Sequence, residues 1–365
     1  GSKAFFVCVD TPVGKDKKAD LTILKTVSVQ LGKVLGKGCL VSVESTLPPR
    51  TMTDVVIPLL EEGQGLKAGR DFHVVHCPER VMPGRLLLNM KSYSRVLGGI
   101  DQASIEAALV YYRQLVEAEI FPTDLTSAEL CKTVENTYRD VQIAFANEVA
   151  LICEQLGADA YNVRRLVNTC PFRDMHLPGS GVGGHCLTKD PWLLLSAVNE
   201  ADGLISRARQ INDSMPEHLA DLVEESLKEA GIKLKDARLS VMGLSFLRDS
   251  DETRNSPSKV VIDRFDGKAK AVVVHDPFAQ ESYKVKITRQ VEEALRGSDC
   301  AIFVTDHSEY LRLDLKRIKA QMRTPIIVDG RNIFNAEKCR AAGLAYRGIG
   351  KGAKPKVTSG RKGGK

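Results

Sequence analysis

Short apolar runs alternate with amphipathic stretches along most of the chain, and this alternation predicts its secondary structure. In the first third, four runs rich in β-branched residues have the length of buried strands. These runs are 4–9, 39–45, 73–77 and 94–99. Helical periodicity lies between them, over 19–35 and 102–118. Strands that alternate with helices are typical of βαβ units, so we expect a parallel sheet covered by helices on both faces.

One long helix is predicted over 127–156, because these residues include neither glycine nor proline. Thr126 and Glu129 form a capping-box pattern at its start, and Gly157 follows its end. At 1.5 Å per residue the helix is about 45 Å long, which suits a spine between domains or subunits. Further helical patterns cover 159–168, 191–201 and 204–230.

The alternation of strands and helices resumes after Lys233 and predicts a second α/β domain. Its strands are expected at 237–244, 269–276, 299–306 and 324–330, and its helices at 256–265, 290–297 and 313–321. The predicted domains are 1–121, a first Rossmann-like domain; 122–232, a central helical domain; 233–350, a second Rossmann-like domain; and 351–365, a basic disordered tail.

Composition and charge restrict the class of protein. The chain has 365 residues, 43% of them hydrophobic and 27% charged, which is typical of a globular protein with two or three domains. Its apolar runs are far shorter than the roughly 20 residues that a membrane-spanning helix needs, and its start has no signal-peptide pattern. The net charge of +6 comes entirely from the tail, so the body is neutral, and nucleic-acid binding through the tail is a minor alternative.

The nine cysteines are scattered, odd in number and without a CxxC pair. This pattern indicates a reducing cytoplasm rather than a disulfide framework, and it predicts no metal site. Most of these cysteines are expected to be small buried apolar residues.

A GxGxxG pattern at Gly179–Gly184 has neither a strand before it nor a helix start after it, so we reject it as a dinucleotide site. The glycines still indicate a close backbone approach, and free N–H groups there suit an anionic ligand or a sugar diphosphate. Cys186 follows this loop, and Asp190-Pro191 has the pattern of a helix N-cap and first turn. A thiol just ahead of a helix, near Lys189, suits a nucleophile, whereas the alternative is a packed core cysteine.

Lys132 and Asn136 are one helical turn apart on the long helix, and together they suit the stabilisation of an oxyanion. The alternative is a solvated helix face. Glu44 and Thr46, and likewise Glu79 and Arg80, follow predicted strands, and ligands of parallel sheets bind at such strand ends. The second α/β domain also has residues at or beyond its predicted strand ends, namely Arg254, Asp329 and Arg331. The alternative interpretation of these three residues is that they form surface ion pairs.

These segments together resemble the nucleotide-sugar 6-dehydrogenase family. The matching motifs are CVDTP (8–12), ESTLPP (44–49), CPERVMPG (77–84), Lys132 and Asn136 followed by FANE (145–148), GSGVGGHCLTKDPW (179–192), DETRNSP (251–257) and DGRN (329–332). They cover nearly the whole chain. CPERVMPG and VGGHC are closest to the UDP-N-acetyl-D-mannosamine dehydrogenase branch, whereas Lys189 is a feature of the UDP-glucose branch.

The resemblance implies two NAD-dependent oxidations at C6 of a UDP-N-acetyl-hexosamine, with a Cys186 thioester between them and a uronic acid as the product. The implied catalytic residues are Cys186, Lys132, Asn136, Asp190, Glu79 and Thr46. The implied NAD contacts are Thr11, Thr46 and Arg254. The implied substrate contacts are Glu79, Arg80, Lys132, Arg173, Gly181, Gly183, Gly184 and Arg331. The implied partner is a second copy that packs against the long helix, with no nucleic acid and no membrane.

Two departures from the family pattern affect these expectations. The leading strand and its GxGxxG turn are not seen ahead of residue 4, so the first Rossmann-like domain is expected to be N-terminally incomplete. Phe246-Leu247 stands where the family has Phe-Lys, which leaves a basic role to Arg248 or to no residue. The alternatives are the same chemistry on UDP-glucose, UDP-GlcNAc or UDP-GalNAc, or a non-catalytic module that binds a UDP-sugar.

Overall fold

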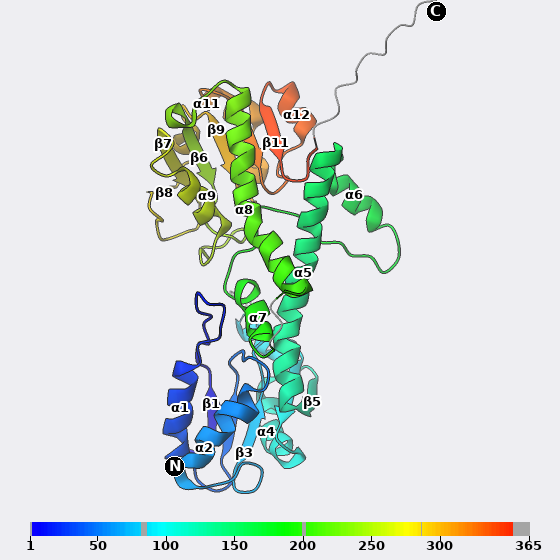
Figure 1. Cartoon of the computed structure of the whole chain (residues 1–365), viewed down its shortest axis with the longest axis vertical. Helices are drawn as coiled ribbons and strands as arrows, with labels where there is room; N and C mark the ends of the chain where they lie inside the picture. The colour runs from blue at the N-terminus through cyan, green and yellow to red at the C-terminus, as the bar shows by residue number, and fades with distance from the viewer. Residues whose placement is uncertain (1, 82–85, 199–201, 286, 353–365) are drawn as a thin grey trace, which may run out of the picture. The chain divides into compact units, whose positions relative to one another are not determined.

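The computed structural model describes residues 2–81, 86–198, 202–285 and 287–352 (Figure 1). The chain forms two compact units, the first comprising Gly1–Arg139 with Lys189–Ser206 and the second Asp140–Thr188 with Arg207–Lys365. The end of the CPERVMPG motif, the end of the helix predicted at 191–201 and the tail from residue 353 lie outside the described residues. In the part that is described, no helix has both the length and the apolar character to cross a membrane.

The first unit contains a five-stranded sheet in the order β1-β2-β3-β4-β5. Its strands are β1 (Ala4–Val7), β2 (Leu40–Val43), β3 (His73–His76), β4 (Arg95–Gly99) and β5 (Ile120–Asp124). The prediction of a purely parallel sheet was wrong, because β4 pairs antiparallel with β3. Hydrophobic alternation is the same for either strand direction, so it does not reveal this reversal. Strand β5 was not predicted; it contains Pro122, and an edge strand tolerates a proline that cannot donate to the ladder.

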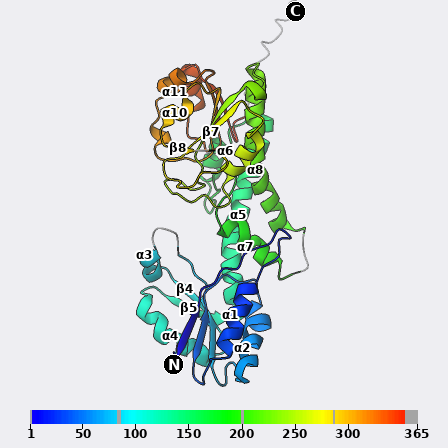
Figure 2. The ribbon, with the colours of Figure 1, turned by 90° about the vertical axis from the view of Figure 1, so that its left-hand side faces the viewer.

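Helices cover both faces of this sheet, as the alternation of elements predicted (Figure 2). Their bounds are α1 (Thr22–Gly32), α2 (Ile57–Gln64), α3 (Leu86–Ser92) and α4 (Gln102–Leu115), with a π-helical turn at Met52–Val56 ahead of α2; of these, α2 and α3 were not predicted. Val41 and Val74 pack with α1 and α2 on one face, while Leu40 and Val75 pack with α4 on the other. Successive strand residues thus bury opposite faces, and the carboxyl ends of β1 to β3 stay together at one edge.

The long helix α5 (Leu125–Leu156) confirms the predicted uninterrupted helix, but its predicted cap was wrong. The side chain of Asp124 accepts the N–H of Ser127 at 2.8 Å and therefore takes the role assigned to Thr126. Glu129 instead accepts the backbone N–H groups of Arg50 at 2.7 Å and Met52 at 2.8 Å. A capping box is a local pattern, and here the backbone N–H groups at the start of another helix bond the glutamate instead.

The second unit contains a six-stranded parallel sheet in the order β11-β10-β9-β6-β7-β8. Its strands are β6 (Arg238–Met242), β7 (Ala271–His275), β8 (Ile287–Thr288), β9 (Cys300–Phe303), β10 (Ile326–Asp329) and β11 (Ala345–Gly348), of which β8 and β11 were not predicted. The strand order reverses between β6 and β9, and ligands of doubly wound sheets bind outside the carboxyl ends at such a point. The α/β class and the presence of two sheets were therefore predicted correctly.

The remaining helices agree with the predicted ones except at α7, which begins earlier, and at α12, which was not predicted. Their bounds are α6 (Ala160–Val167), α7 (Cys186–Leu195), α8 (Leu204–Glu229), α9 (Pro257–Phe265), α10 (Val291–Leu295), α11 (Leu315–Gln321) and α12 (Ala336–Ala341). Helix α8 carries Pro216 in its interior and bends along its length (Figure 1).

We expect Glu129 to make the stability of the chain depend on pH. Burial raises the pKa of this carboxyl to about 7, above its ordinary value of 4.5. The folded state then holds the proton more tightly than the unfolded chain, so this group's contribution is fully present below pH 4.5 and is lost as the pH rises through about 7. Glu129→Gln removes this titration, so urea unfolding between pH 4.5 and 7 should show a flatter loss of stability, by up to about 3 kcal/mol. Parallel curves for the two proteins would contradict the assignment.

Candidate active site

Cys186 is the first residue of α7 and is exposed. The predicted helix start at Asp190-Pro191 was wrong, because α7 begins four residues earlier and Pro191 lies in its interior. The Gly-rich loop therefore does lead into a helix, contrary to the prediction. No strand is formed at residues 168–185, all of which are described. A thiol at the first position of a helix faces the positive end of its dipole, which favours the thiolate.

The glycines ahead of Cys186 are required by close packing within the chain. A Cβ on Gly183 would lie 2.4 Å from Cβ of Phe246, and one on Gly184 would lie 2.7 Å from Cζ of the same ring. Gly181 has a φ of +119° and packs against Pro216. The N–H of Gly184 donates to the carbonyl of Arg254 at 2.8 Å, so this group of the loop is already engaged by the protein. Contacts of Gly181, Gly183 and Gly184 with substrate stay a prediction.

Asp190 lies one turn after Cys186 in α7 and is held by Asn136, another of the predicted catalytic residues. Nδ2 of Asn136 donates to Oδ2 of Asp190 at 2.5 Å, and Asp190 is only 1% exposed. Burial raises the pKa of Asp190, whereas the Asn136 bond and the charges of Lys189 and Lys132 lower it. Among the described residues, Oδ1 of Asp190 has no hydrogen-bond partner. The structure thus brings Lys132, Asn136 and Asp190 together around a buried oxygen that can accept a proton or a hydrogen bond.

The predicted strand-end residues of the first unit do lie at the carboxyl edge of its sheet. Oγ1 of Thr11 donates to the backbone carbonyl of Thr46 at 2.6 Å. Oε1 of Glu79 accepts the N–H of Val81 at 2.7 Å and contacts Nη1 of Arg95 at 2.8 Å. These donors fix one oxygen of Glu79 and leave its orientation well defined. Arg80 forms an ion pair at 2.9 Å with Glu135 on α5.

This edge of the sheet is supported by three residues to which the sequence analysis assigned no role: Ser42, Arg95 and Tyr112. The hydroxyl of Tyr112 donates to Glu44 at 2.6 Å and lies 2.7 Å from the hydroxyl of Ser42. Burial is the main cause of the raised pKa of Glu44, and the Tyr112 bond opposes it. Arg95 is 3% exposed and contacts Glu79. A charged residue at the start of an otherwise apolar strand was the signal that could have identified Arg95.

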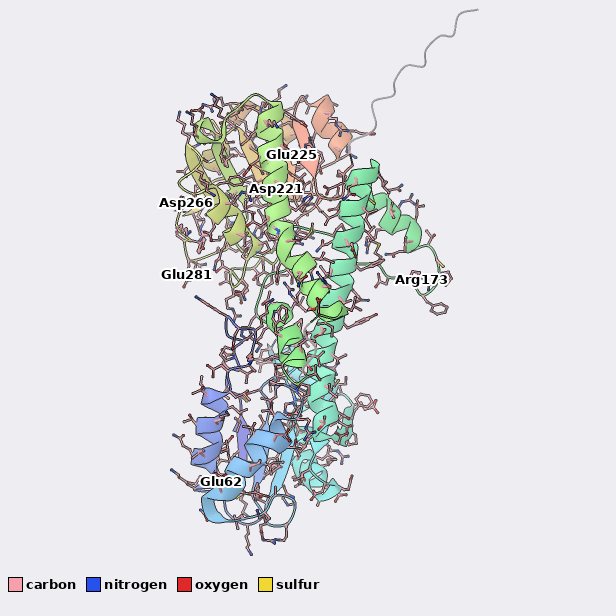
Figure 3. All side chains as sticks on the ribbon, viewed as in Figure 1. Glu62, Arg173, Asp221, Glu225, Asp266 and Glu281 are labelled. Carbon is pink, nitrogen blue, oxygen red and sulfur yellow. The ribbon has the colours of Figure 1, made fainter. Side chains whose placement is uncertain are left out.

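In the second unit, Arg331 lies next to the switch point of the sheet. Its Nε donates to the carbonyl of Val304 at 3.2 Å, just beyond β9, and its Nη2 donates to that of Phe246 at 3.4 Å. Arg254 forms an ion pair with Glu252, and this contact lowers the pKa of the carboxyl. Nε of Arg248 bonds Asp306 at 3.0 Å. Arg173 lies on the exposed loop that follows α6 (Figure 3).

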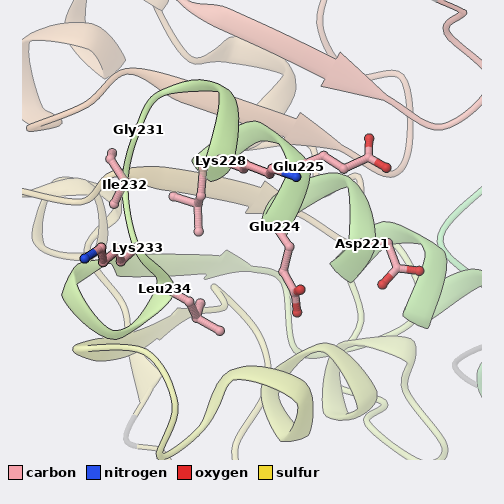
Figure 4. Close-up of a pocket in the computed structure, with 9 residues that line it drawn as sticks. Asp221, Glu224, Glu225, Lys228, Gly231, Ile232, Lys233 and Leu234 are labelled. Carbon is pink, nitrogen blue, oxygen red and sulfur yellow. The ribbon is translucent and has the colours of Figure 1, made fainter.

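A separate cavity of about 640 Å³ lies along the C-terminal part of α8 (Figure 4). Acidic side chains of Asp221, Glu224 and Glu225 line it together with Lys228 and Lys233. Arg264 pairs with Asp221 and Glu224 at 3.0 and 2.9 Å, so these carboxylates have a structural partner. An acidic lining disfavours a diphosphate, and none of the predicted site residues is in it.

Comparisons with known proteins assign each part of the chain to one family. Models of the UDP-glucose/GDP-mannose dehydrogenase family match it as NAD binding domain over residues 1–116, central domain over 126–214 and UDP binding domain over 240–336. The Gly179–Gly184 loop falls in the central domain match and outside the NAD binding match, in agreement with its rejection as a dinucleotide site.

Individual relatives extend over almost the whole chain. It is 42% identical to the UDP-N-acetyl-D-mannosamine dehydrogenase of Pyrococcus horikoshii, over 96% of this chain and 82% of that protein. A solved structure of UDP-D-ManNAc dehydrogenase from the same organism has a TM-score of 0.90 at 41% identity, covering 97% and 82% of the two chains. The NDP-N-acetyl-D-galactosaminuronic acid dehydrogenase of Methanosarcina mazei Go1 has a TM-score of 0.89 at 36% identity, covering 96% and 78%.

The resemblance inferred from scattered motifs is therefore confirmed by similarity along the full set of domains. Cys186, Lys132 and Asn136 lie in the match to the central domain, and Arg331 lies in the match to the UDP binding domain. On this combined evidence, the chain belongs to the UDP-glucose/GDP-mannose dehydrogenase family.

Proposed function

We propose that the chain catalyses the NAD-dependent oxidation of UDP-N-acetyl-D-mannosamine at C6 to the uronic acid. The observation that carries this proposal is Cys186 at the first position of α7, one turn ahead of an Asp190 that Asn136 holds. The substrate is taken from the 42% identical relative, which bears the name UDP-N-acetyl-D-mannosamine dehydrogenase. The reducing cytoplasm keeps such a thiol active, and we place the reaction there.

Cys186 acts as the nucleophile of the second stage. Its thiolate adds to the C6 aldehyde to give a tetrahedral adduct, which becomes a thioester when hydride leaves. Water then attacks the thioester carbon, the C–S bond breaks, and the thiol returns with a carboxylate as product. Lys132 and Asn136 stabilise the oxyanions of these adducts, and Glu79 assists the attack by water.

In the first oxidation, Asp190 accepts the proton that leaves the C6 hydroxyl. Its Oδ1 has no partner among the described residues, and its raised pKa suits a carboxylate that takes up a proton from the C6 hydroxyl through water. Thr46 holds that water in this proposal, with its half-buried side chain at the carboxyl edge of β2. Asn136 fixes the other oxygen of Asp190, so the carboxyl presents one defined acceptor.

The residues at the edge of the first sheet fit a dinucleotide. Thr11 and Thr46 meet at the carboxyl ends of the parallel strands β1 and β2, which is where doubly wound sheets bind such ligands. They would hold NAD there, and Arg254 is the third residue that this proposal assigns to the cofactor. When bound, NAD supplies the hydride acceptor, and two molecules are needed for each alcohol that becomes a carboxylate.

The UDP-sugar is assigned to the switch point of the second sheet. Arg331 lies beside the carboxyl end of β9, and Ser180 of the Gly-rich loop bonds the carbonyl of Val304 at the same end. The remaining substrate contacts in the proposal are Glu79, Arg80, Lys132, Gly181, Gly183 and Gly184. Related enzymes named for N-acetyl-galactosaminuronic acid make a second UDP-hexosamine the main alternative substrate.

We propose that the active form is a homodimer or a higher homo-oligomer. Phe145, Ile152 and Leu156 are 58%, 49% and 76% exposed, and their spacing places them on one side of α5. A helix of a soluble protein exposes such a stripe where a partner covers it. Arg173, on the exposed loop after α6, would reach the sugar nucleotide of the neighbouring subunit.

The substrate assignment predicts a stoichiometry. UDP-N-acetyl-D-mannosamine should yield two NADH per sugar oxidised, followed by absorbance at 340 nm, and the product should be the uronic acid. UDP-glucose, UDP-GlcNAc and UDP-GalNAc should react at least about tenfold more slowly, because a polar pocket rejects a misplaced hydroxyl or amide. One NADH per sugar would contradict the thioester route, and binding of the UDP-sugar without turnover would favour a non-catalytic module.

Cys186→Ser should separate the two stages. We expect turnover to fall by at least about a hundredfold, since an alkoxide is formed less readily than a thiolate and its ester hydrolyses more slowly than a thioester. Mass spectrometry should detect either no adduct or a stable one on the variant. Cys170→Ser, which changes another exposed cysteine, is the matched control and should keep full activity. Wild-type turnover in Cys186→Ser would show that Cys186 is not the nucleophile.

The exposed stripe of α5 predicts the oligomeric state. Phe145→Asp combined with Ile152→Asp should convert the wild-type oligomer into a species with the mass of one chain, measured by light scattering. Charges on this face would have to be buried without partners in the interface. Val110→Asp, on a 63% exposed residue of α4, is the control and should leave the mass unchanged. A wild-type protein with the mass of one chain would refute this part of the proposal.

A further inference from the structure

A chain of buried polar side chains connects the two ends of the segment 179–187, which carries Cys186. At its first residue, Oδ1 of Asn147 on α5 accepts the N–H of Gly179 at 2.9 Å. Nδ2 of the same amide donates to Oδ1 of Asn212 on α8 at 2.9 Å. Nδ2 of Asn212 then donates to Oδ1 of Asp140 at 2.8 Å, which returns the chain to α5.

The other end of the segment is reached through Arg209 on α8. Nη1 of Arg209 bonds the same Oδ1 of Asp140 and lies 3.5 Å from the carbonyl oxygen of Leu187. In a regular helix this carbonyl would accept the N–H of the residue four positions later, which is Pro191 and has none. Arg209 therefore offers a donor to the carbonyl that the proline leaves unpaired, and that carbonyl belongs to the residue next to Cys186.

Stability gives a poor explanation for this arrangement. Four side chains with no exposed surface make up the network: Asp140, Asn147, Arg209 and Asn212. Nη2 of Arg209 also pairs with Asp213, whose side chain is 61% exposed. Replacing a buried ion pair by apolar side chains is often neutral or stabilising. In addition, Oδ2 of Asp140 and Nε of Arg209 have no hydrogen-bond partner among the described residues. We refer to the four side chains as the Asp140 network.

The segment that the network spans needs anchors at both ends. Gly181 and Gly184 have φ values of +119° and +87°, and glycines in this region gain freedom when the chain around them is released. Cys186 lies between Gly184 and the Leu187 carbonyl, so any movement of either end of the segment also moves the thiol. A displacement of about 1 Å at a reacting group is enough to cost two orders of magnitude in rate.

We propose that the Asp140 network is a positioning device for Cys186, fixing Gly179 and Leu187 so that the thiol stays at the first position of α7. Its effect on turnover rests on the proposed function, whereas its effect on the geometry and reactivity of the thiol does not. None of the four residues needs to touch the substrate.

Arg209→Lys and Asn147→Ala test the two ends separately in the full chain. The first keeps the buried charge but loses the fork of donors, and the second removes the acceptor for Gly179. Asp299→Asn is the matched control, because Asp299 is equally buried and bonds Arg323 and Thr324 instead of this segment. For each protein we would measure the rate of Cys186 alkylation by iodoacetamide from pH 6 to 10 by peptide mass spectrometry, then kcat and KM, and the urea midpoint.

Both network variants should shift the pH profile of Cys186 alkylation to higher pH and lower kcat by about tenfold or more, with KM changed by less than about twofold. Asp299→Asn should lower the urea midpoint and leave the profile and kcat unchanged. Network variants that lose stability but keep the wild-type profile would overturn the proposal.

The alkylation profile also separates this proposal from the proposed function. A wild-type protein that oxidises no UDP-sugar refutes the function, and a shifted profile in the variants still supports positioning. An unchanged profile in a fully active set of variants refutes positioning alone. If Arg209→Lys does not fold, Asn147→Ala and Asn212→Ser test the proposal in its place. Both variants keep the ion pair between Arg209 and Asp140, so neither leaves a buried charge without its partner.

Discussion

The missing amide proton of Pro191 is the constraint on which the surroundings of Cys186 depend. A proline inside a helix removes one ladder bond and leaves a carbonyl without its donor. In α7 that carbonyl belongs to Leu187, and Nη1 of Arg209 on another helix lies 3.5 Å from it. Arg209 is fully buried and pairs with two carboxylates, Asp140 and Asp213, and Asp140 in turn accepts a hydrogen bond from Asn212. The position of one proline thus accounts for a buried cation and for the polar residues that accompany it.

Two buried carboxyls of the long helix and of α7 show how similar groups take different roles. Both oxygens of Glu129 accept backbone N–H groups at the start of the π-helical turn, so this carboxyl has a structural partner on each oxygen. Asp190 has one oxygen bonded by Asn136 and the other without a partner among the described residues. The charges of Lys132 and Lys189 also act on Asp190. Environment, rather than residue type or burial, distinguishes the structural acid from the candidate for proton transfer.

The elements that depend on local pattern were predictable from the sequence. An uninterrupted helix over 127–156 and most strands of both sheets follow from periodicity, and Cys186, Lys132 and Asn136 are candidates from motif and spacing. The direction of β4 and the edge strands β5, β8 and β11 were missed, because alternation does not encode direction and edge strands are short or contain proline. Arg209 was also missed. Its role depends on a carbonyl 22 positions away, and no local pattern links the two residues.

The Gly-rich loop shows why a motif that was chemically suggestive needed the structure for its interpretation. The spacing of the glycines indicates that the backbone closely approaches a neighbouring group, but it does not identify that group. A phosphate, an aromatic ring or another backbone segment would require the same glycines. Here the ring of Phe246 occupies the space that Cβ atoms on Gly183 and Gly184 would need. Phe246 also accepts a bond from Arg331 through its carbonyl, beside the switch point of the second sheet. The glycines therefore allow the segment that ends at Cys186 to lie against the carboxyl edge of that sheet, which is a requirement for any ligand bound there to reach the thiol.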